Sequence, residues 1–329
     1  RIPKLLRFIP GTAQDVRAYF LTLQYWLSGS DDNAFQMVQA LVDRYADGPR
    51  KGLRGKAKVE PPQEYPDVGV YHPDLPRRMS EKLSDLPWKK DAVGTVGVLM
   101  LRSYVLGKDA NHYDGVIRAL EARGLNVIPA FAGGLDQRPA IEALMMKDGK
   151  ASVDAVINLT GFSLVGGPAY SDAKAAEEIL ARLDVPYIAA HPVEFQTLQQ
   201  WGANRQGLLP LESTIMIAIP ELDGGTQPMV FGGRSDANGE ACTGCERKCS
   251  WAPSDGVRAM QSCPERAEAL ADKMLKLVQL KRAELAKRKL AVVLFNFPPN
   301  GGAAGTAQFL SVFESLHRTL KRLKAEGYD

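Results

Sequence analysis

Two amphipathic segments open the chain. Between residues 14 and 28, apolar side chains recur every three or four positions, which predicts a helix with one hydrophobic face. The same spacing returns over residues 33–46, and Gly29-Ser30-Asp31-Asp32 between them supplies a helix stop and then a helix cap. We therefore expect residues 1–46 to form a helical hairpin. Residues 47–92 are rich in proline, which blocks regular helices and inner strands, so we expect a surface connector there.

Residues 93–232 alternate between short apolar runs and amphipathic segments. The runs are typical of strands buried on both faces, and we expect such strands at 93–101, 125–131, 155–159 and 185–190. Helices are expected between them at 111–123, 139–146 and 172–183. This alternation predicts a parallel-sheet α/β domain of the flavodoxin-like or Rossmann-like type. Two further runs, 214–220 and 228–232, are expected to form a hairpin across Asp223-Gly224-Gly225.

The last third of the chain repeats the α/β pattern once. A cysteine-bearing loop at 233–264 leads into an amphipathic linking helix at 265–289. Residues 290–297 then predict a buried strand, and residues 306–324 a helix after a Pro/Gly loop. We expect residues 290–329 to be the first β-α unit of a further, truncated α/β domain.

One edge of the expected sheet is the place to look for a ligand. In open parallel sheets ligands bind beyond the carboxyl ends of the strands. The loops there carry the candidate contacts His191, Gly161, Gly166 and Gly167. Backbone NH groups before the last helix could hold an anion at Asn300, Gly301 and Gly302, although a plain tight turn is the alternative. Because no lysine follows the final glycine of this loop, we do not expect this chain to hydrolyse ATP, and no catalytic residue stands out.

All four cysteines lie close together in the sequence, with the spacing C-x2-C-x3-C-x13-C. Such spacing allows the sulfurs of Cys242, Cys245, Cys249 and Cys263 to converge on one metal centre. Three close cysteines and a fourth followed by proline favour a 4Fe–4S cluster, with zinc, disulfides or free thiols as alternatives. Arg247 and Lys248 are expected to lower the thiol pKa values. The expected role of the centre is to hold the loop in place, without turnover.

Composition excludes several classes of function. The 329 residues include 45% hydrophobic and 24% charged positions, which is typical of a folded globular chain. A net charge of +3 is too balanced for a nucleic-acid-binding protein. The chain also has no apolar run of about 18 residues, so we expect no membrane span.

Several longer blocks resemble the large H subunit of the magnesium chelatases. They comprise residues 7–27, Tyr71-His72-Pro73-Asp74-Leu75-Pro76, Ile219-Pro220-Glu221-Leu222-Asp223-Gly224 and Phe295-Asn296-Phe297-Pro298-Pro299-Asn300. The blocks occur in order and extend over essentially the whole chain. The resemblance to this family is therefore more specific than any single motif above.

The resemblance implies a porphyrin-binding subunit of an enzyme that forms nitrogen–metal bonds. The family inserts Mg²⁺ into protoporphyrin IX in chlorophyll and bacteriochlorophyll biosynthesis, together with I and D subunits as partners and with ATP hydrolysed on the I chain. It implies a bacterial cytoplasmic location, or one at the surface of a photosynthetic membrane. The family's large chains are several times longer, so we expect a fragment that lacks the C-terminal body and is inactive alone. The cysteine loop points to the bacteriochlorophyll branch of the family and suggests oxygen sensitivity.

Two other interpretations remain open from the sequence. One is the large subunit of cobaltochelatase, in which Co²⁺ and a corrin precursor replace Mg²⁺ and porphyrin. The other is a non-catalytic iron–sulfur scaffold or redox-sensing module without a porphyrin site. Metal analysis and tetrapyrrole binding distinguish these alternatives.

Overall fold

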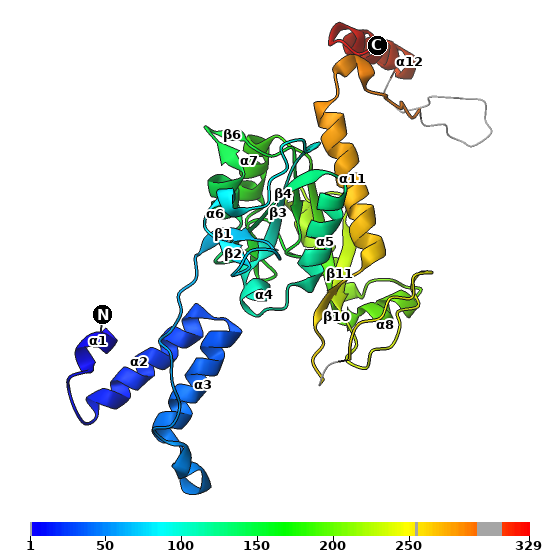
Figure 1. Ribbon diagram of the computed structural model, residues 1–329. Helices are drawn as coiled ribbons and strands as arrows, with labels where there is room; N and C mark the ends of the chain where they lie inside the picture. The colour runs from blue at the N-terminus through cyan, green and yellow to red at the C-terminus, as the bar shows by residue number, and fades with distance from the viewer. Residues whose placement is uncertain (1, 254–255, 295–310) are drawn as a thin grey trace. The chain divides into compact units, whose positions relative to one another are not determined.

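The computed structural model of the chain describes residues 2–253, 256–294 and 311–329 (Figure 1). The chain divides into two units, Arg1–Leu275 and Lys276–Asp329, and the division falls inside helix α11 (Pro264–Arg282). The finer division expected from the sequence, with boundaries at 46, 92, 232, 264 and 289, stays a prediction. In the described ranges, no helix is both long enough and apolar enough to cross a membrane.

The first unit begins with the two predicted helices. Helix α1 (Ile2–Leu6) precedes α2 (Ala13–Ser28) and α3 (Asp31–Tyr45), and a short 3-10 helix follows at Gly48–Leu53. The Ser30 hydroxyl accepts a hydrogen bond from the Asn33 amide at 3.1 Å, which satisfies one of the free NH groups at the start of α3. The cap expected from the sequence is therefore confirmed.

The apolar face expected on these helices is largely exposed. Trp26 is 71% exposed and Phe35 60%, whereas Tyr25 is 3% exposed. The extended segment after α3 covers the hairpin on the Tyr25 side: Tyr25 donates to the Glu60 carbonyl, and Asn33 exchanges two hydrogen bonds with the Gln63 backbone. A single extended, proline-rich segment is too narrow to bury the apolar faces of both α2 and α3.

An eight-stranded sheet forms the centre of the first unit, in the order β12-β11-β10-β7-β3-β4-β1-β2. Its strands are β1 (Val68–Tyr71), β2 (Met79–Ser80), β3 (Gly94–Leu101), β4 (Leu125–Ala132), β7 (Ala155–Asn158), β10 (Tyr187–Thr197), β11 (Met229–Arg234) and β12 (Met260–Ser262). The five parallel strands β4-β3-β7-β10-β11 follow the 2-1-3-4-5 order of flavodoxin-like sheets. The predicted fold class is confirmed, and β1, β2 and β12 extend it with antiparallel pairs.

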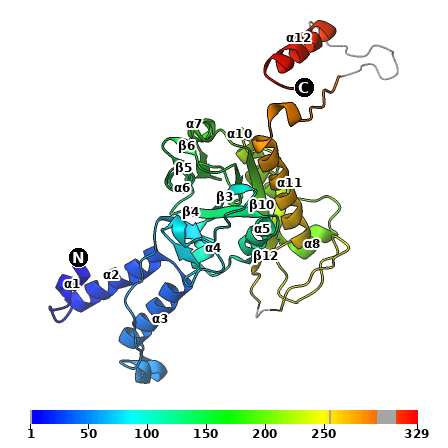
Figure 2. The ribbon, with the colours of Figure 1, turned by 45° about the horizontal axis from the view of Figure 1, so that its top comes forward.

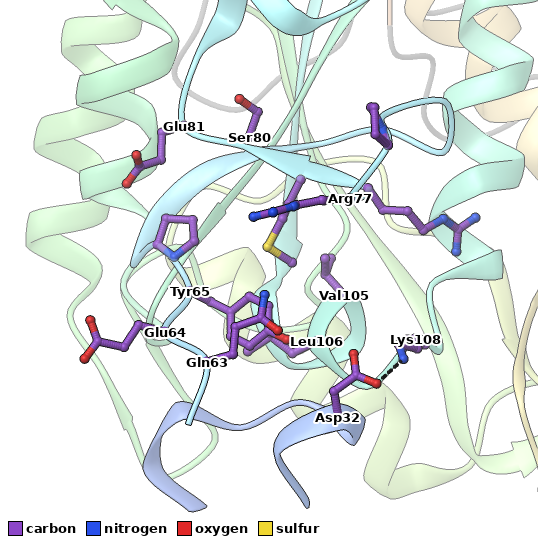
Figure 3. A pocket seen from close by; sticks show the side chains of 14 residues that line it. Asp32, Gln63, Glu64, Tyr65, Arg77, Ser80, Glu81, Val105, Leu106 and Lys108 are labelled. Carbon is purple, nitrogen blue, oxygen red and sulfur yellow. Dashed lines mark hydrogen bonds and ion pairs between the residues drawn. The ribbon is translucent and has the colours of Figure 1, made fainter. Parts of the chain in front are cut away.

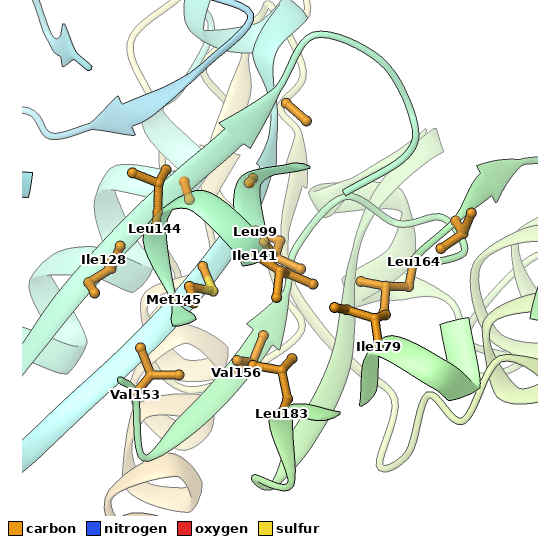
Figure 4. Close-up of a cluster of buried hydrophobic side chains, with 14 of the residues drawn as sticks. Leu99, Ile128, Ile141, Leu144, Met145, Val153, Val156, Leu164, Ile179 and Leu183 are labelled. Carbon is orange, nitrogen blue, oxygen red and sulfur yellow. The ribbon is translucent and has the colours of Figure 1, made fainter. Parts of the chain in front are cut away.

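Helices cover both faces of this sheet (Figures 1 and 2). Helices α6 (Arg138–Leu144) and α7 (Ala173–Leu183) lie on one face, where their apolar side chains form a core cluster with Leu99, Ile128 and Val156 (Figure 4). Helix α5 (Asn111–Ala122) lies on the other face and buries Tyr113, Val116, Ile117 and Leu120. Shorter elements connect these layers: α4 (Arg102–Leu106), α8 (Leu198–Ala203), the 3-10 turn Leu83–Asp85, and the strand pairs β5–β6 (Met146–Lys147, Lys150–Ala151) and β8–β9 (Gly166–Gly167, Tyr170–Ser171).

Two sequence expectations inside this unit are wrong. Residues 47–92 are not merely a surface connector, because β1 joins the sheet beside β4 and its Val70 and Tyr71 are fully buried. Residues 214–220 are not a strand, because Pro210 opens a helical stretch: α9 (Pro210–Ser213), a π-helical turn at Thr214–Ala218 and α10 (Ile219–Leu222). The Glu212 carboxylate accepts from the Leu209 amide at 3.0 Å and fixes the start of this stretch. The expected hairpin is replaced by a parallel β10–β11 pair.

The second unit holds the end of α11, a 3-10 turn at Leu285–Lys287 and helix α12 (Val312–Ala325). The expected linking helix is thus shorter than 265–289. Of the strand predicted at 290–297, residues 290–294 are not in a strand, and 295–297 lie outside the described residues. Residues 306–310 of the predicted last helix also lie outside them, and its described part is confirmed by α12.

Candidate functional site

The structure brings together two of the residues predicted at the carboxyl edge of the sheet. Gly161 follows β7 with φ +73°, and a Cβ placed there would lie 3.1 Å from Pro192 Cδ and 4.0 Å from His191 Cβ. His191 is 1% exposed, and burial lowers the pKa of its imidazole, so the ring is neutral at pH 7. Its Nδ1 has no hydrogen-bond partner among the described residues. Gly161 and His191 therefore lie next to each other. A residue with a side chain at position 161 would crowd Pro192 of β10, which explains the glycine there.

The other predicted contacts lie elsewhere. Gly166 and Gly167 form β8, and a Cβ on Gly167 would clash with the side chain of Leu135. Close packing therefore explains why both positions are glycine, without a bound ligand. Asn300, Gly301 and Gly302 lie outside the described residues, so their proposed role in holding an anion stays a prediction.

Buried polar groups fill the space beyond the end of β7. Asn158 accepts from the Thr160 amide and hydroxyl at 3.0 and 2.8 Å, and its amide group donates to Tyr187 Oη at 3.0 Å. Nearby, Ser171 Oγ lies 3.0 Å from both Ser163 Oγ and the Asp223 carboxylate. Since these groups satisfy one another, they hold the loop after β7 in a fixed shape.

A cavity lies beside the segment that the sequence assigned to a connector. It has a volume of about 820 Å³, within the range of small-molecule sites, and is lined by residues 63–66, 76–81, Val105, Leu106, Lys108 and Asp32 (Figure 3). Val105 and Leu106 lie almost fully buried beneath it. Its charged lining includes three basic and three acidic side chains: Arg77, Arg78, Lys108, Asp32, Glu64 and Glu81. Sequence reasoning missed this site because its walls are far apart in the chain. The adjacent Arg77-Arg78 pair within a proline-rich segment was the one available signal.

Arg78 holds one wall of this cavity against α5. Its guanidinium donates to the Asp114 carboxylate at 2.8 Å, and the Tyr71 hydroxyl donates to the other oxygen of the same carboxylate at 2.5 Å. Burial, and then the hydrogen bond to Asp114, raise the pKa of Tyr71, so its hydroxyl remains a donor across the accessible pH range. We refer to Tyr71, Arg78 and Asp114 as the β1–α5 clasp.

A second pair of contacts holds the turn between β1 and β2. His72 Nε2 lies 2.9 Å from Glu121 Oε1, and Arg118 binds both Glu121 and Asp74. Burial raises the pKa of Glu121, but the hydrogen bonds from His72 and Arg118 outweigh it, so the pKa lies below its usual value. The Tyr71–Pro76 block that carries part of the family resemblance therefore has a structural role here.

The four cysteines do not form a compact metal site within the described residues. All four are free and half-buried, and the Cys242 amide donates to the Cys249 carbonyl at 2.8 Å. Their loop runs beside α8, where Cys242 Sγ lies 3.4 Å from the Leu198 carbonyl (Figure 2). Within the described ranges, no three His, Cys, Asp or Glu side chains are gathered closely enough to hold a metal ion.

The charges around the thiols also differ from the sequence expectation. Arg247 forms two hydrogen bonds of 2.8 Å with Glu268, so it is engaged by a carboxylate. Burial, followed by the neighbouring Cys245 and Cys242, raises the pKa of Cys249, and burial raises that of Cys263. For these two thiols the expected lowering of the pKa is wrong, because burial dominates and outweighs the lowering that Arg247, paired with Glu268, exerts on Cys249.

Comparisons with known proteins find relatives over nearly the whole chain. Residues 23–329 match the family described as CobN/Magnesium Chelatase. The chain is 54% identical to the magnesium-chelatase H subunit of Rhodobacter capsulatus and 55% identical to that of Cereibacter sphaeroides, covering 99% of this chain and 27% of each relative. It is 28% identical over 71% of its length to the aerobic cobaltochelatase subunit CobN of Sinorhizobium, of which it covers 17%.

A solved structure has the same fold. The catalytic subunit of cobaltochelatase from Mycobacterium tuberculosis superimposes with a TM-score of 0.66 and 21% identity, over 94% of this chain and 23% of that chain. The chain spans about a quarter of the length of the two magnesium-chelatase H subunits named above. On the family match and on this likeness in fold, the chain belongs to the CobN/magnesium chelatase family.

Proposed function

We propose that the chain is part of the H subunit of a magnesium chelatase, which inserts Mg²⁺ into protoporphyrin IX for bacteriochlorophyll or chlorophyll synthesis. The observation that carries the proposal is the 54–55% identity with two subunits of that name over 99% of the chain. The 28% identity with the cobaltochelatase subunit is much lower, which favours magnesium over cobalt. The proposal includes I and D subunits as partners, with ATP hydrolysed there, and a cytoplasmic location.

The chemistry explains why such an enzyme needs partners. Mg²⁺ gives up its water shell reluctantly, and two pyrrole nitrogens must lose their protons before they bind it. In the proposal ATP-driven work on other chains supplies that energy. This chain contributes binding surfaces for the tetrapyrrole or for the rest of the enzyme, and we assign it no catalytic residue.

A segment exchange tests this function. Residues 1–329 replace the aligned segment of the Rhodobacter capsulatus relative, and Mg-porphyrin fluorescence is followed with the I and D subunits, Mg²⁺ and ATP. We expect the hybrid to retain most of the activity, whereas a hybrid with the aligned Sinorhizobium cobaltochelatase segment loses it. If the first hybrid is stable and binds its partners but inserts no Mg²⁺, the proposed function is wrong.

We further propose that Cys242, Cys245, Cys249 and Cys263 hold a 4Fe–4S cluster with a structural role. Four free thiols in one segment of 22 residues are a suitable donor set for iron or zinc, and the loop must rearrange for all four to reach one centre. The cluster would hold the loop against α8. Anaerobic purification should give about four iron and four sulfide per chain and a broad visible absorption band that Cys245→Ser removes. A colourless protein with one zinc per chain would show a zinc site instead.

A further inference from the structure

Helices α2 and α3 each have one side hydrogen-bonded to the extended segment that follows them. On α2 the Tyr25 hydroxyl donates to the Glu60 carbonyl, and on α3 the Asn33 side chain exchanges hydrogen bonds of 2.8 and 2.9 Å with the Gln63 backbone. An α-helix has about 3.6 residues per turn, so the apolar positions of the sequence pattern lie on the side of each helix away from Tyr25 and Asn33. These apolar side chains therefore point away from the extended segment.

The apolar side chains on this side are exposed, and we call them the hairpin face. The face comprises Val16, Tyr19, Leu23, Trp26 and Leu27 on α2 and Phe35, Val38, Val42 and Tyr45 on α3, with exposed fractions from 37% to 71%. Within α2 and α3, both of which the structure describes, the charged residues on this side are Asp31 and Asp32 in the first turn of α3. Few charges and several aromatic side chains are typical of the core of a protein interface.

The two rows of apolar side chains lie side by side. A short turn at Gly29 and Ser30 joins the end of α2 to the start of α3. At the other ends, Asp15 accepts hydrogen bonds from Arg44 at 2.8 Å and from the Tyr45 hydroxyl at 2.9 Å. The helices have 16 and 15 residues, so the face is two helices wide and about 22 Å long. A surface of this shape fits further helices, which complete a helix pair to a bundle.

The length of the relatives favours one occupant for this face. The chain covers 27% of each of the two H subunits, so almost three quarters of those polypeptides lie outside the matched segment. A covalently linked segment reaches the face at an effective concentration of up to about a millimolar, which favours it over a second copy or a separate protein. A contact within one subunit is also permanent, and permanent interfaces are the more apolar ones.

We infer that the hairpin face binds an apolar helical segment from the remaining part of the longer subunit. The inference rests on the proposed function only for the identity of that subunit. Trp26 and Phe35 are the main contacts, because large aromatic side chains contribute most to such interfaces. The contact holds the helical hairpin against the rest of the subunit and takes no part in the chemistry of the tetrapyrrole.

Hydroxyl-radical footprinting with mass spectrometry tests the inference, because it reports the oxidation of single aromatic side chains. The two samples are the 329-residue chain and the hybrid Rhodobacter capsulatus subunit that carries it. We expect Trp26 to be oxidised at least about fivefold more slowly in the hybrid, as for a side chain that passes from the surface into an interface core. Tyr25 is 3% exposed and should be protected equally in both samples, which shows that the hairpin is folded.

A charge on the hairpin face should expose Trp26 again. In the hybrid, Phe35→Asp should restore most of the Trp26 oxidation rate of the isolated chain, because the new carboxylate would be buried without a partner. Phe35 is 60% exposed, so this substitution should leave Tyr25 protected in the isolated chain. The matched control is Lys51→Asp, which changes an exposed residue outside the hairpin face and should leave Trp26 protected in the hybrid.

Several outcomes would overturn the inference. It is wrong if Trp26 is oxidised equally fast in both samples, or if Phe35→Asp leaves it as protected in the hybrid as Lys51→Asp does. Protection of the isolated chain that disappears on dilution would assign the face to a second copy, and protection only with anionic phospholipid vesicles would assign it to a membrane; either result refutes the inference. Mg²⁺ insertion by the unsubstituted hybrid is measured separately. An inactive hybrid with a protected Trp26 overturns the proposed function alone, and an active hybrid with an exposed Trp26 overturns the inference alone.

Discussion

Removal of the Asp114 carboxylate should loosen β1 from α5. This carboxylate accepts hydrogen bonds from the Tyr71 hydroxyl at 2.5 Å and from Arg78 at 2.8 Å. In Asp114→Ala the Tyr71 hydroxyl stays fully buried without an acceptor, which costs about 1–3 kcal/mol. Loss of the half-exposed ion pair with Arg78 adds about 0.2–1 kcal/mol. We therefore expect the free energy of unfolding to fall by about 1–4 kcal/mol.

A double-mutant cycle separates this mechanism from a general effect of the substitution. Tyr71→Phe alone removes the donor and should cost about 1 kcal/mol. In the double variant no orphan hydroxyl remains, so the total cost should be about 1 kcal/mol or more below the sum of the single changes. Asp91→Ala is the control, because Asp91 is exposed and lies outside the β1–α5 clasp.

Urea denaturation followed by tryptophan fluorescence gives the free energies, and hydrogen exchange at the Val70 and Tyr71 amides reports on β1 itself. Faster exchange at these amides in Asp114→Ala, with little change in the centre of β3, would support local loosening. The reasoning is refuted if Asp114→Ala destabilises no more than Asp91→Ala, or if the two clasp substitutions are additive.

Three further predictions concern charge, core and backbone packing. The pKa of Glu121 lies below its usual value of 4.5 in the folded chain. The ionised carboxylate therefore stabilises the fold fully above pH 4.5, and this stabilisation is lost as the pH falls through the folded-state pKa. Urea midpoints measured from pH 7 to 3 should decline less steeply in Glu121→Gln than in wild type. Leu99→Ala should cost about 2–5 kcal/mol, since Leu99 is fully buried in the cluster of Figure 4, and a thermal transition unchanged from wild type would contradict that placement. Gly115→Ala should lower the melting temperature, because the added Cβ would clash with the Ser262 side chain, whereas Gly52→Ala meets nothing within 4 Å and should leave it unchanged.

Some candidate site features can be recognised from neighbouring residues in the sequence, whereas others depend on contacts between distant segments. Cysteine spacing predicted a metal site, which stays a prediction, because the positions of four cysteines within 22 residues do not fix how their side chains converge. The cavity at residues 63–81 could not be found in this way. Its floor comes from α4 and its walls from segments more than twenty residues earlier, and only sheet pairing brings them together.

The sequence by itself determined the alternation of strands and helices between residues 93 and 190. Strands buried on both faces must be continuously apolar, and amphipathic helices must repeat with the helical period, so both leave a local pattern. The cap at Ser30 was visible for the same reason. Only the tertiary structure decided that Val68–Tyr71 joins the sheet, since four residues between prolines have no periodic signal and their hydrogen bonds go to β4, about sixty residues away. Tertiary structure likewise decided that residues 210–222 are helical: the β-branched run around Ile217 favours a strand locally, but Pro210, the Glu212 carboxylate and the parallel pairing of β10 with β11 outweigh that preference.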